Sequence, residues 1–131
     1  MALDLNDKTA ILELLNRYCH NADYNPPERM RELFTADGVF EVPAMGLRFE
    51  GIDAIVAFFT SSREASASAR HIISNVVIDG SGDRATSSAY LQVLADRDGT
   101  MSMVAFGRYM DELTRGADGR WRLAHRSVVL G

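Results

Sequence analysis

Few of the residues that support several kinds of protein chemistry occur in this sequence. Its one cysteine, Cys19, excludes an internal disulfide and a cysteine-rich metal cluster. Its one lysine, Lys8, disfavours catalysis through a lysine Schiff base. Three histidines are present, but they share no metal-ligand spacing, so no metal site is expected: His20, His71 and His125.

A net positive charge and long apolar runs are also lacking. The formal net charge of −4 supplies no field that would attract nucleic acid or an anionic membrane. No apolar run approaches the ~20 residues of a membrane-spanning helix, and no secretion signal opens the chain. The sequence therefore predicts a cytoplasmic protein without nucleic-acid or membrane partners.

The remaining composition is that of a globular domain. Of the 131 residues, 47% are hydrophobic and 24% are charged, which argues against disorder. A chain of this length can bury a core without disulfides or metals. We expect one domain that spans residues 1–131.

The first half of the chain has helical periodicity. Apolar residues recur at three- and four-residue spacing near the start: Ile11, Leu14, Leu15, Tyr18 and Ala22. This predicts a helix that Asn6 or Asp7 caps and that ends near Asp23, because Pro26 and Pro27 follow.

Shorter elements are predicted between this helix and residue 70. A short helix should start at the prolines and bury Met30, Leu33 and Phe34, and Thr35–Gly38 should form a turn. Two short strands should pair around Pro43–Gly46: Val39–Val42 and Leu47–Glu50. A third helix is indicated by Ile52, Ile55, Val56 and Phe59, and a loop by Ser61–Ser68.

The second half is rich in strand signals, so the predicted fold class is α+β. Four runs of about ten residues are separated by Gly- and Asp-rich connections, which predict an antiparallel meander: Asp79–Asp83, Asp96–Gly99 and Arg115–Gly119. The first run places apolar residues on both faces: Ile72, Ile73, Val76, Val77 and Ile78. Apolar residues on both faces are unusual for a sheet that exposes one face to solvent. We therefore expect a homodimer or homotrimer packed sheet to sheet.

Four polar residues stand where apolar ones are expected. Tyr18 lies on the apolar stripe of the first helix, and Asp23 lies at its end, where the helix dipole disfavours a carboxylate. His71 begins an apolar strand, and alternation places it on the face of Ile73, Asn75 and Val77. Arg126 lies between Ala124 and Val128 on one face of the last strand. Taken singly, each also has an ordinary structural explanation.

Six segments in order resemble the SnoaL-like branch of the nuclear-transport-factor-2-like superfamily, over nearly the whole chain: Tyr18–Asp23, Leu33–Phe40, Gly51–Ile55, Arg70-His71, Gly107–Asp111 and Asp118–Leu123. The resemblance implies a cone-shaped fold, in which a curved antiparallel sheet wraps around N-terminal helices and encloses an apolar pocket. Within the superfamily, the residues are most similar to enzymes of the scytalone dehydratase, bile-acid 7α-dehydratase and lindane dehydrochlorinase type.

The resemblance also implies catalytic residues. Those enzymes pair a helix aspartate with a strand histidine, which match Asp23 and His71, 48 positions apart. Tyr18 matches a tyrosine of the bile-acid enzyme, and Arg126 matches an assisting arginine. An imidazole oriented by a carboxylate can remove a proton from carbon, while a tyrosine and an arginine stabilise the departing or enolate oxygen. Such chemistry needs no metal or organic cofactor.

Helix stripes, strand alternation and the implied cone predict the walls of the substrate pocket: Leu14, Val56, Phe59, Ile73, Asn75, Met103, Ala105 and Phe106. The function expected is a lyase or isomerase that removes a proton, with loss of water, from a small hydrophobic cyclic hydroxy-ketone. Two alternatives stay open: a polyketide cyclase or isomerase on the same scaffold, and a non-catalytic ligand-binding or association module.

Overall fold

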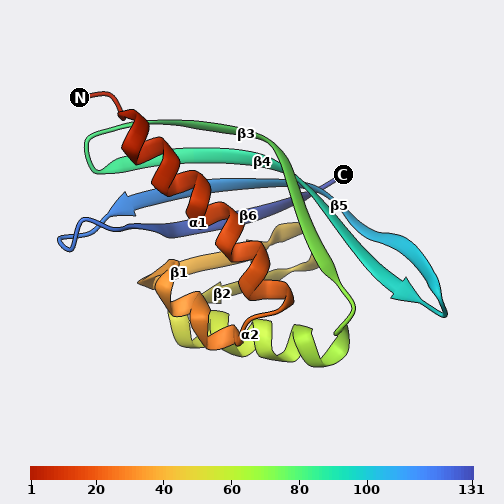
Figure 1. Ribbon diagram of the computed structural model, residues 1–131. Helices are drawn as coiled ribbons and strands as arrows, with labels where there is room; N and C mark the ends of the chain where they lie inside the picture. The colour runs from red at the N-terminus through yellow and green to blue at the C-terminus, as the bar shows by residue number, and fades with distance from the viewer.

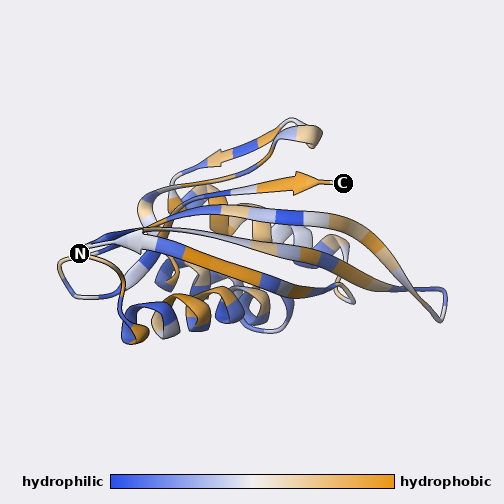
Figure 2. Cartoon of the chain, turned by 90° about the horizontal axis from the view of Figure 1, so that it is seen from above, coloured by the Kyte–Doolittle hydropathy of each residue, from blue (hydrophilic) through white to orange (hydrophobic).

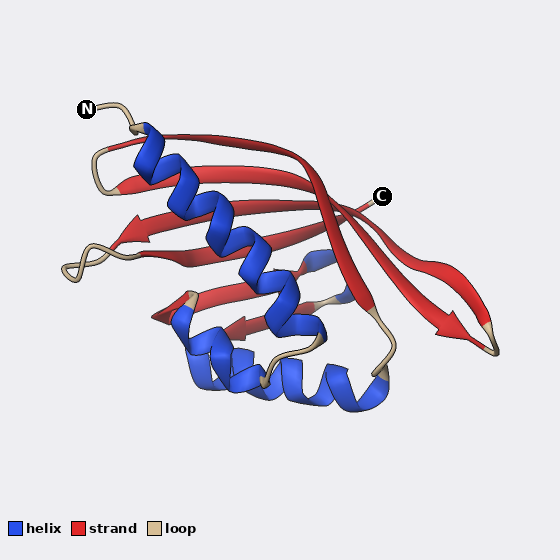
Figure 3. Cartoon of the chain, viewed as in Figure 1, coloured by secondary structure: helices blue, strands red, loops and turns tan.

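A single curved sheet with helices on one side forms the molecule, and the computed structural model describes all 131 residues (Figures 1 and 3). The elements in chain order are α1 (Leu5–Asp23), the 3-10 helix η1 (Pro27–Glu32), β1 (Phe34–Val42), the 3-10 helix η2 (Pro43–Met45), β2 (Leu47–Glu50), α2 (Ile52–Ala65), β3 (Arg70–Ser81), β4 (Arg84–Arg97), β5 (Thr100–Arg115) and β6 (Trp121–Leu130). The strand order is β2-β1-β6-β5-β4-β3. The α+β class and the cone-like architecture predicted above are confirmed.

Helix α1 starts earlier than predicted and ends where predicted. Its cap is Asp4, not Asn6 or Asp7, because the Asp4 carboxylate accepts from the backbone N–H of Asp7 at 2.8 Å and the Asp7 carboxylate in turn faces the N–H of Asp4. The predicted stripe is buried through Tyr18, and the last helical residue is Asp23.

The short hairpin is confirmed, with Val39 paired to Glu50 and Val42 to Leu47. Thr35–Gly38, predicted as a turn, instead belongs to β1. The residues on either side of this segment pair in parallel with β6, Phe34 with Leu123 and Val39 with His125, and the register shifts between them. A parallel pairing between distant segments leaves no local turn signal in the sequence.

Helix α2 is longer than predicted, since it continues through Ala65 into the segment predicted as the loop Ser61–Ser68. The extra turn is stabilised by tertiary contacts, because Arg63 reaches back to the end of α1. Only the four residues between Ala65 and Arg70 connect α2 to the sheet.

The four long strands form the predicted antiparallel meander. They cross the face of α1, and the β4–β5 hairpin extends beyond the helices (Figure 1). Gly107 of β5 pairs with Leu130 of β6, and a Cβ atom on it would lie 2.2 Å from the Val129 carbonyl oxygen. Only glycine allows so close an approach of two strands.

A bulge in β3 corrects the predicted face of two residues. Ser74 pairs with Tyr90 and Val77 with Ser88, so two residues of β3 oppose one of β4. Asn75 takes a left-handed conformation there, with φ 55°. His71 and Ile73 therefore share one face, whereas Asn75 and Val77 are exposed instead of lying on that face.

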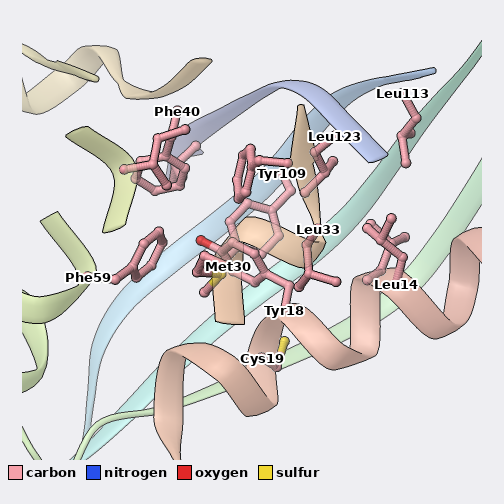
Figure 4. Packing of buried hydrophobic residues seen from close by; sticks show 14 of the residues in the cluster. Leu14, Tyr18, Cys19, Met30, Leu33, Phe40, Phe59, Tyr109, Leu113 and Leu123 are labelled. Atoms are coloured by element: carbon pink, nitrogen blue, oxygen red, sulfur yellow. The ribbon is translucent and has the colours of Figure 1, made fainter. Parts of the chain in front are cut away.

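One hydrophobic core joins the helices to the inner face of the sheet (Figure 4). Aromatic rings fill its centre: the Tyr18 ring meets those of Phe59 and Tyr109 edge-on, with centroids 5.6 Å and 5.5 Å away. Neither α1 nor α2 combines the length and the hydropathy that crossing a bilayer would require.

Candidate functional site

His71 and Asp23 form a close contact at the junction of β3 and α1. The imidazole Nδ1 lies 2.6 Å from Oδ1 of Asp23, and the backbone N–H of His71 donates to Oδ2 at 2.9 Å. Both carboxylate oxygens thus bind one residue, which fixes the position of the ring. The Asp23 side chain is 7% exposed and that of His71 is 21% exposed, so the pair lies at the edge of the core and one side of the imidazole stays accessible.

Arg63 holds the end of α1 in the position that this contact requires. Its Nη2 donates to the carbonyl oxygens of Asn21, Ala22 and Asn25 at 2.8–2.9 Å. These carbonyls have no partner within the helix, and the guanidinium charge also suits the negative end of the helix dipole. The end of the helix that carries Asp23 is therefore held by a cation from α2 that the sequence analysis placed in a loop.

Replacing Arg63 by methionine should destabilise the protein by about 2 kcal/mol and lower Tm by roughly 6–10 °C, because three carbonyl oxygens lose a charged donor. Urea unfolding followed by circular dichroism would measure the change. Arg17→Met is the matched control, since Arg17 makes only an exposed pair with Glu13 and should cost less than about 0.5 kcal/mol. Equal losses in the two variants would contradict this account.

Tyr18 and Arg126 meet in a second cluster inside the cone. The guanidinium carbon of Arg126 lies 4.2 Å from the ring centre of Tyr18 and 3.7 Å from that of Tyr109. All three side chains are buried, and Arg126 is 0% exposed. The cation therefore contacts both rings, an arrangement that compensates part of its lost hydration.

Asp111 neutralises this cation. Its two oxygens accept from Nε and Nη2 of Arg126 at 2.7 Å and 2.9 Å, and Ser87 donates to Oδ2 at 2.8 Å. The three residues lie side by side on β4, β5 and β6. The sequence analysis expected Arg126 to offer free positive charge, but most of that charge is paired. Only Nη1 has no hydrogen-bond partner, and a buried donor left in this state costs about 1–3 kcal/mol.

Burial controls the protonation of this cluster. It raises the pKa of Tyr18 and of Tyr109 well above their usual range, although the nearby Arg126 opposes the shift. Burial alone would lower the pKa of Arg126, but the charge and hydrogen bonds of Asp111 raise it above its ordinary value. Near neutral pH the cluster therefore contains two neutral hydroxyl donors and one cation.

The two clusters are separate, because no hydrogen bond or ion pair links His71 or Asp23 to Tyr18 or Arg126. Tyr18 and Asp23 lie five residues apart on a helix that stays regular to Asp23, which separates them by about 140° around its axis. Cys19 lies between the clusters, and burial raises the pKa of its thiol to about 11. His20 is exposed, as expected for the outer side of α1.

The residues predicted to line a pocket fall into three groups. Leu14, Val56 and Phe59 are buried in the core, and Ile73 and Ala105 are half-buried against it. Asn75 is exposed because of the bulge in β3. Met103 and Phe106 do not face the core: they are 51% and 54% exposed. Phe106 lies on the outer side because inward alternation on β5 runs through Ala105 and Gly107. Met103 lies there because the pairing with β4 shifts between Val93 and Leu94, which leaves Val104 as an extra residue.

The principal hollows of the molecule lie elsewhere. The largest, about 600 Å³, lies on the outer face of the sheet around Met110 and His125. Two others of about 410 Å³ and 330 Å³ lie near Thr35 and near Gly80. No predicted catalytic residue lines any of the three.

Sequence reasoning missed Tyr109, Asp111, Ser87 and Arg63 as members of these clusters. One signal was available. Every second residue of this part of β5 faces the core, and Asp111 is one of them, so alternation places a carboxylate among buried residues. The partner of that carboxylate depends on the register between β5 and β6, which includes a shift between Glu112 and Leu113.

A curved sheet closed over N-terminal helices, with polar clusters inside, defines the nuclear-transport-factor-2-like class. The chain belongs to the SnoaL-like domain family, whose profile matches residues 3–127. A search of curated proteins gives no match. The predicted family is therefore confirmed, and the particular enzyme type within it stays a prediction.

Several solved structures are similar over nearly the whole chain. A Mycobacterium tuberculosis protein of unknown function is 25% identical with a TM-score of 0.91, over 98% of this chain and 78% of that one. An NTF2-like protein from Novosphingobium aromaticivorans is 27% identical with a TM-score of 0.89, over 96% and 82%. A Catenulispora acidiphila protein, solved in complex with S-DNPA, is 27% identical with a TM-score of 0.84, over 97% and 95%.

Proposed function

We propose that this protein is a cofactor-free lyase or isomerase that removes a proton, with loss of water, from a small hydrophobic cyclic hydroxy-ketone. The observation that carries the proposal is the contact between Nδ1 of His71 and Oδ1 of Asp23 at 2.6 Å. The second oxygen of Asp23 binds the backbone N–H of the same residue, so the carboxylate is held in place to receive the ring nitrogen.

This contact sets the tautomer of the imidazole. An ionised carboxylate is only an acceptor, so the proton between the two groups belongs to Nδ1 and the lone pair of the imidazole is on Nε2. Nε2 has no partner within the protein and lies on a side chain that is 21% exposed. A substrate C–H at that edge would transfer its proton to Nε2, and Asp23 would stabilise the imidazolium that forms.

The electrons of the broken C–H bond move toward the carbonyl oxygen and form an enolate. Tyr18 supplies a neutral hydroxyl donor for that oxygen or for the departing hydroxyl, and the unpartnered Nη1 of Arg126 lies in the same cluster. When the enolate collapses, the hydroxyl leaves from the β-carbon, takes back the proton that Nε2 of His71 removed and departs as water, so that an enone and a neutral imidazole remain. Because the two clusters are separate, the substrate must span them.

The aromatic core around Tyr18 supports an apolar ligand, since its rings would pack against a cyclic substrate that enters from the His71 edge. The similar Catenulispora protein was solved in complex with S-DNPA, which supports a ligand site in this scaffold. Within the family, we place the protein nearest to dehydratases of the scytalone and bile-acid type, because Tyr18, Asp23, His71 and Arg126 match their residues.

Two alternatives share this scaffold, which serves isomerases and cyclases as well as dehydratases. One incubation separates them, with 3-hydroxycyclohexanone and 2-tetralone as probes in D₂O. Enone formation, followed by ultraviolet absorbance, would identify a lyase. Deuterium uptake by both ketones, with no enone formed from 3-hydroxycyclohexanone, would identify an isomerase or cyclase, and NMR would follow the uptake. Binding of 2-tetralone without either reaction would identify a binding module and contradict the proposal.

Tyr18→Phe should slow deuterium uptake by about 10- to 100-fold while the KM changes less than about threefold, because the hydroxyl acts mainly on charge that develops in the transition state. Steady-state kinetics at several 2-tetralone concentrations would separate the two parameters. The ring stays in place, so the core is preserved. An unchanged kcat would remove Tyr18 from the acid role.

We also propose that two or three copies of this chain associate through the outer face of the sheet. Large apolar side chains are exposed there on adjacent strands: Ile72, Val77, Tyr90, Met103, Phe106, Met110 and Val129. Figure 2 shows hydrophobic stretches along the long strands, including the end of β6. Exposed apolar surface on this scale is typical of an interface, and one self-complementary patch closes a symmetric dimer.

Light scattering at micromolar concentration should give two or three times the 14.5 kDa mass of the chain. Phe106→Lys should convert the assembly to monomers, because it places a charge in the centre of the apolar face. Leu12→Lys is the control, since Leu12 is exposed on α1, away from the sheet. A monomeric wild-type protein would contradict this proposal.

A further inference from the structure

The charged residues buried inside the cone do not balance. They are Asp23, Asp111 and Arg126, which sum to a formal charge of −1 when His71 is neutral. The only buried cation is bound by both oxygens of Asp111. Such charges are poorly screened away from water, so an additional anion would meet net repulsion.

Neutral donors dominate the remaining polar capacity of the cluster. The hydroxyls of Tyr18 and Tyr109 stay protonated, and Nη1 of Arg126 is buried without a partner. A carbonyl oxygen can accept from such donors without bringing a charge of its own. A carboxylate would need an unpaired cation, which the bidentate contact with Asp111 removes.

We propose that Asp111 sets the charge selectivity of this site, so that the protein accepts a neutral carbonyl compound and excludes the carboxylate of the same shape. The proposal rests on the proposed function, since it assumes that the substrate oxygen meets the cluster of Tyr18, Tyr109 and Arg126. Asp111 acts through Arg126 and is therefore a positioning and specificity residue, not a catalytic one. Ser87 supports it with one hydrogen bond to Oδ2.

A matched pair of ligands tests this directly: 2-acetylnaphthalene and 2-naphthoate have similar shape and differ in charge. Isothermal titration calorimetry on the wild-type protein should show the ketone binding at least about tenfold more tightly than the carboxylate. In Asp111→Asn, the affinity for 2-naphthoate should rise at least about tenfold, because Arg126 loses its counter-charge, while the affinity for the ketone changes less than about threefold.

Ser87→Ala is the control, because it removes one hydrogen bond and leaves the charge pair, so the ratio of the two affinities should stay within about twofold of wild type. A structural role alone would change both affinities together and leave the ratio unchanged. If Asp111→Asn does not fold, the wild-type ratio still decides the proposal.

Three results would overturn the proposal: equal or tighter binding of 2-naphthoate by the wild-type protein, an unchanged ratio in folded Asp111→Asn, and binding of neither compound. These outcomes are independent of the reaction assay. A ketone preference without deuterium uptake by 2-tetralone would refute the proposed reaction and support the selectivity. Deuterium uptake without a ketone preference would support the reaction and refute the selectivity.

Discussion

His71→Gln should lower the rate of deuterium uptake by 2-tetralone by at least about 10³-fold, while the fold stays intact. Glutamine fills similar space and its amide can still donate to Asp23, but it cannot take up a proton. General bases of this kind contribute about 10²–10⁴-fold to a rate. The backbone bond from residue 71 to Asp23 does not depend on the side chain, so β3 and α1 should keep their positions.

NMR measurement of uptake, together with circular dichroism of both proteins, would check this result. His20→Gln is the matched control, because His20 is an exposed histidine one turn before the end of α1 and should leave the rate within about twofold. Asp23→Asn should fall in between, with a loss of about 10²-fold or more, because an amide no longer fixes the tautomer or stabilises the imidazolium. A normal rate in His71→Gln would disprove the mechanism.

Arg126→Met should destabilise the protein by about 3–5 kcal/mol. The substitution keeps much of the side-chain volume but leaves Asp111 buried with no cation, and both side chains are 0% exposed. The contacts of the cation with the Tyr18 and Tyr109 rings are lost at the same time. Urea unfolding with an unchanged m-value would report the loss as a shift in midpoint.

The double variant Asp111→Leu/Arg126→Met provides the control. It removes both charges together, so no uncompensated ion is left, and its stability should lie within about 1–2 kcal/mol of the wild-type protein. The positive coupling would show that the pair, and not either side chain, is the stabilising unit. A double variant that loses the sum of the two single effects would contradict this interpretation.

Local patterns in the sequence predicted most elements of the fold. The hairpin between β1 and β2 follows from two short apolar runs around Pro43–Gly46. The four long strands follow from the Gly- and Asp-rich connections between them. The errors occurred where distant contacts mattered: β6 pairs with β1 on both sides of Thr35–Gly38, and Arg63 contacts the end of α1 from the last turns of α2.

The candidate site also has a part that the sequence predicted and a part that it did not. His71 and Asp23 were selected through their match to a family, and their contact needs only the crossing of β3 over the end of α1. Their roles as base and orienting acid stay predictions that the variants above test. The pocket residues on β3 and β5 were assigned by uninterrupted alternation, which fails at a bulge because one extra residue moves every later side chain to the opposite face.

Taken alone, the order of residues determined the class of fold, the extent of the long strands and the family, because these depend on periodicity, turn chemistry and motifs that neighbouring residues carry. Tertiary structure alone decided that Arg126 is neutralised by Asp111, that aromatic rings fill the centre of the cone, and that Met103 and Phe106 face outward. Strand register is the physical reason, since it selects which charges become neighbours across the sheet, and no single strand encodes the register of its partner.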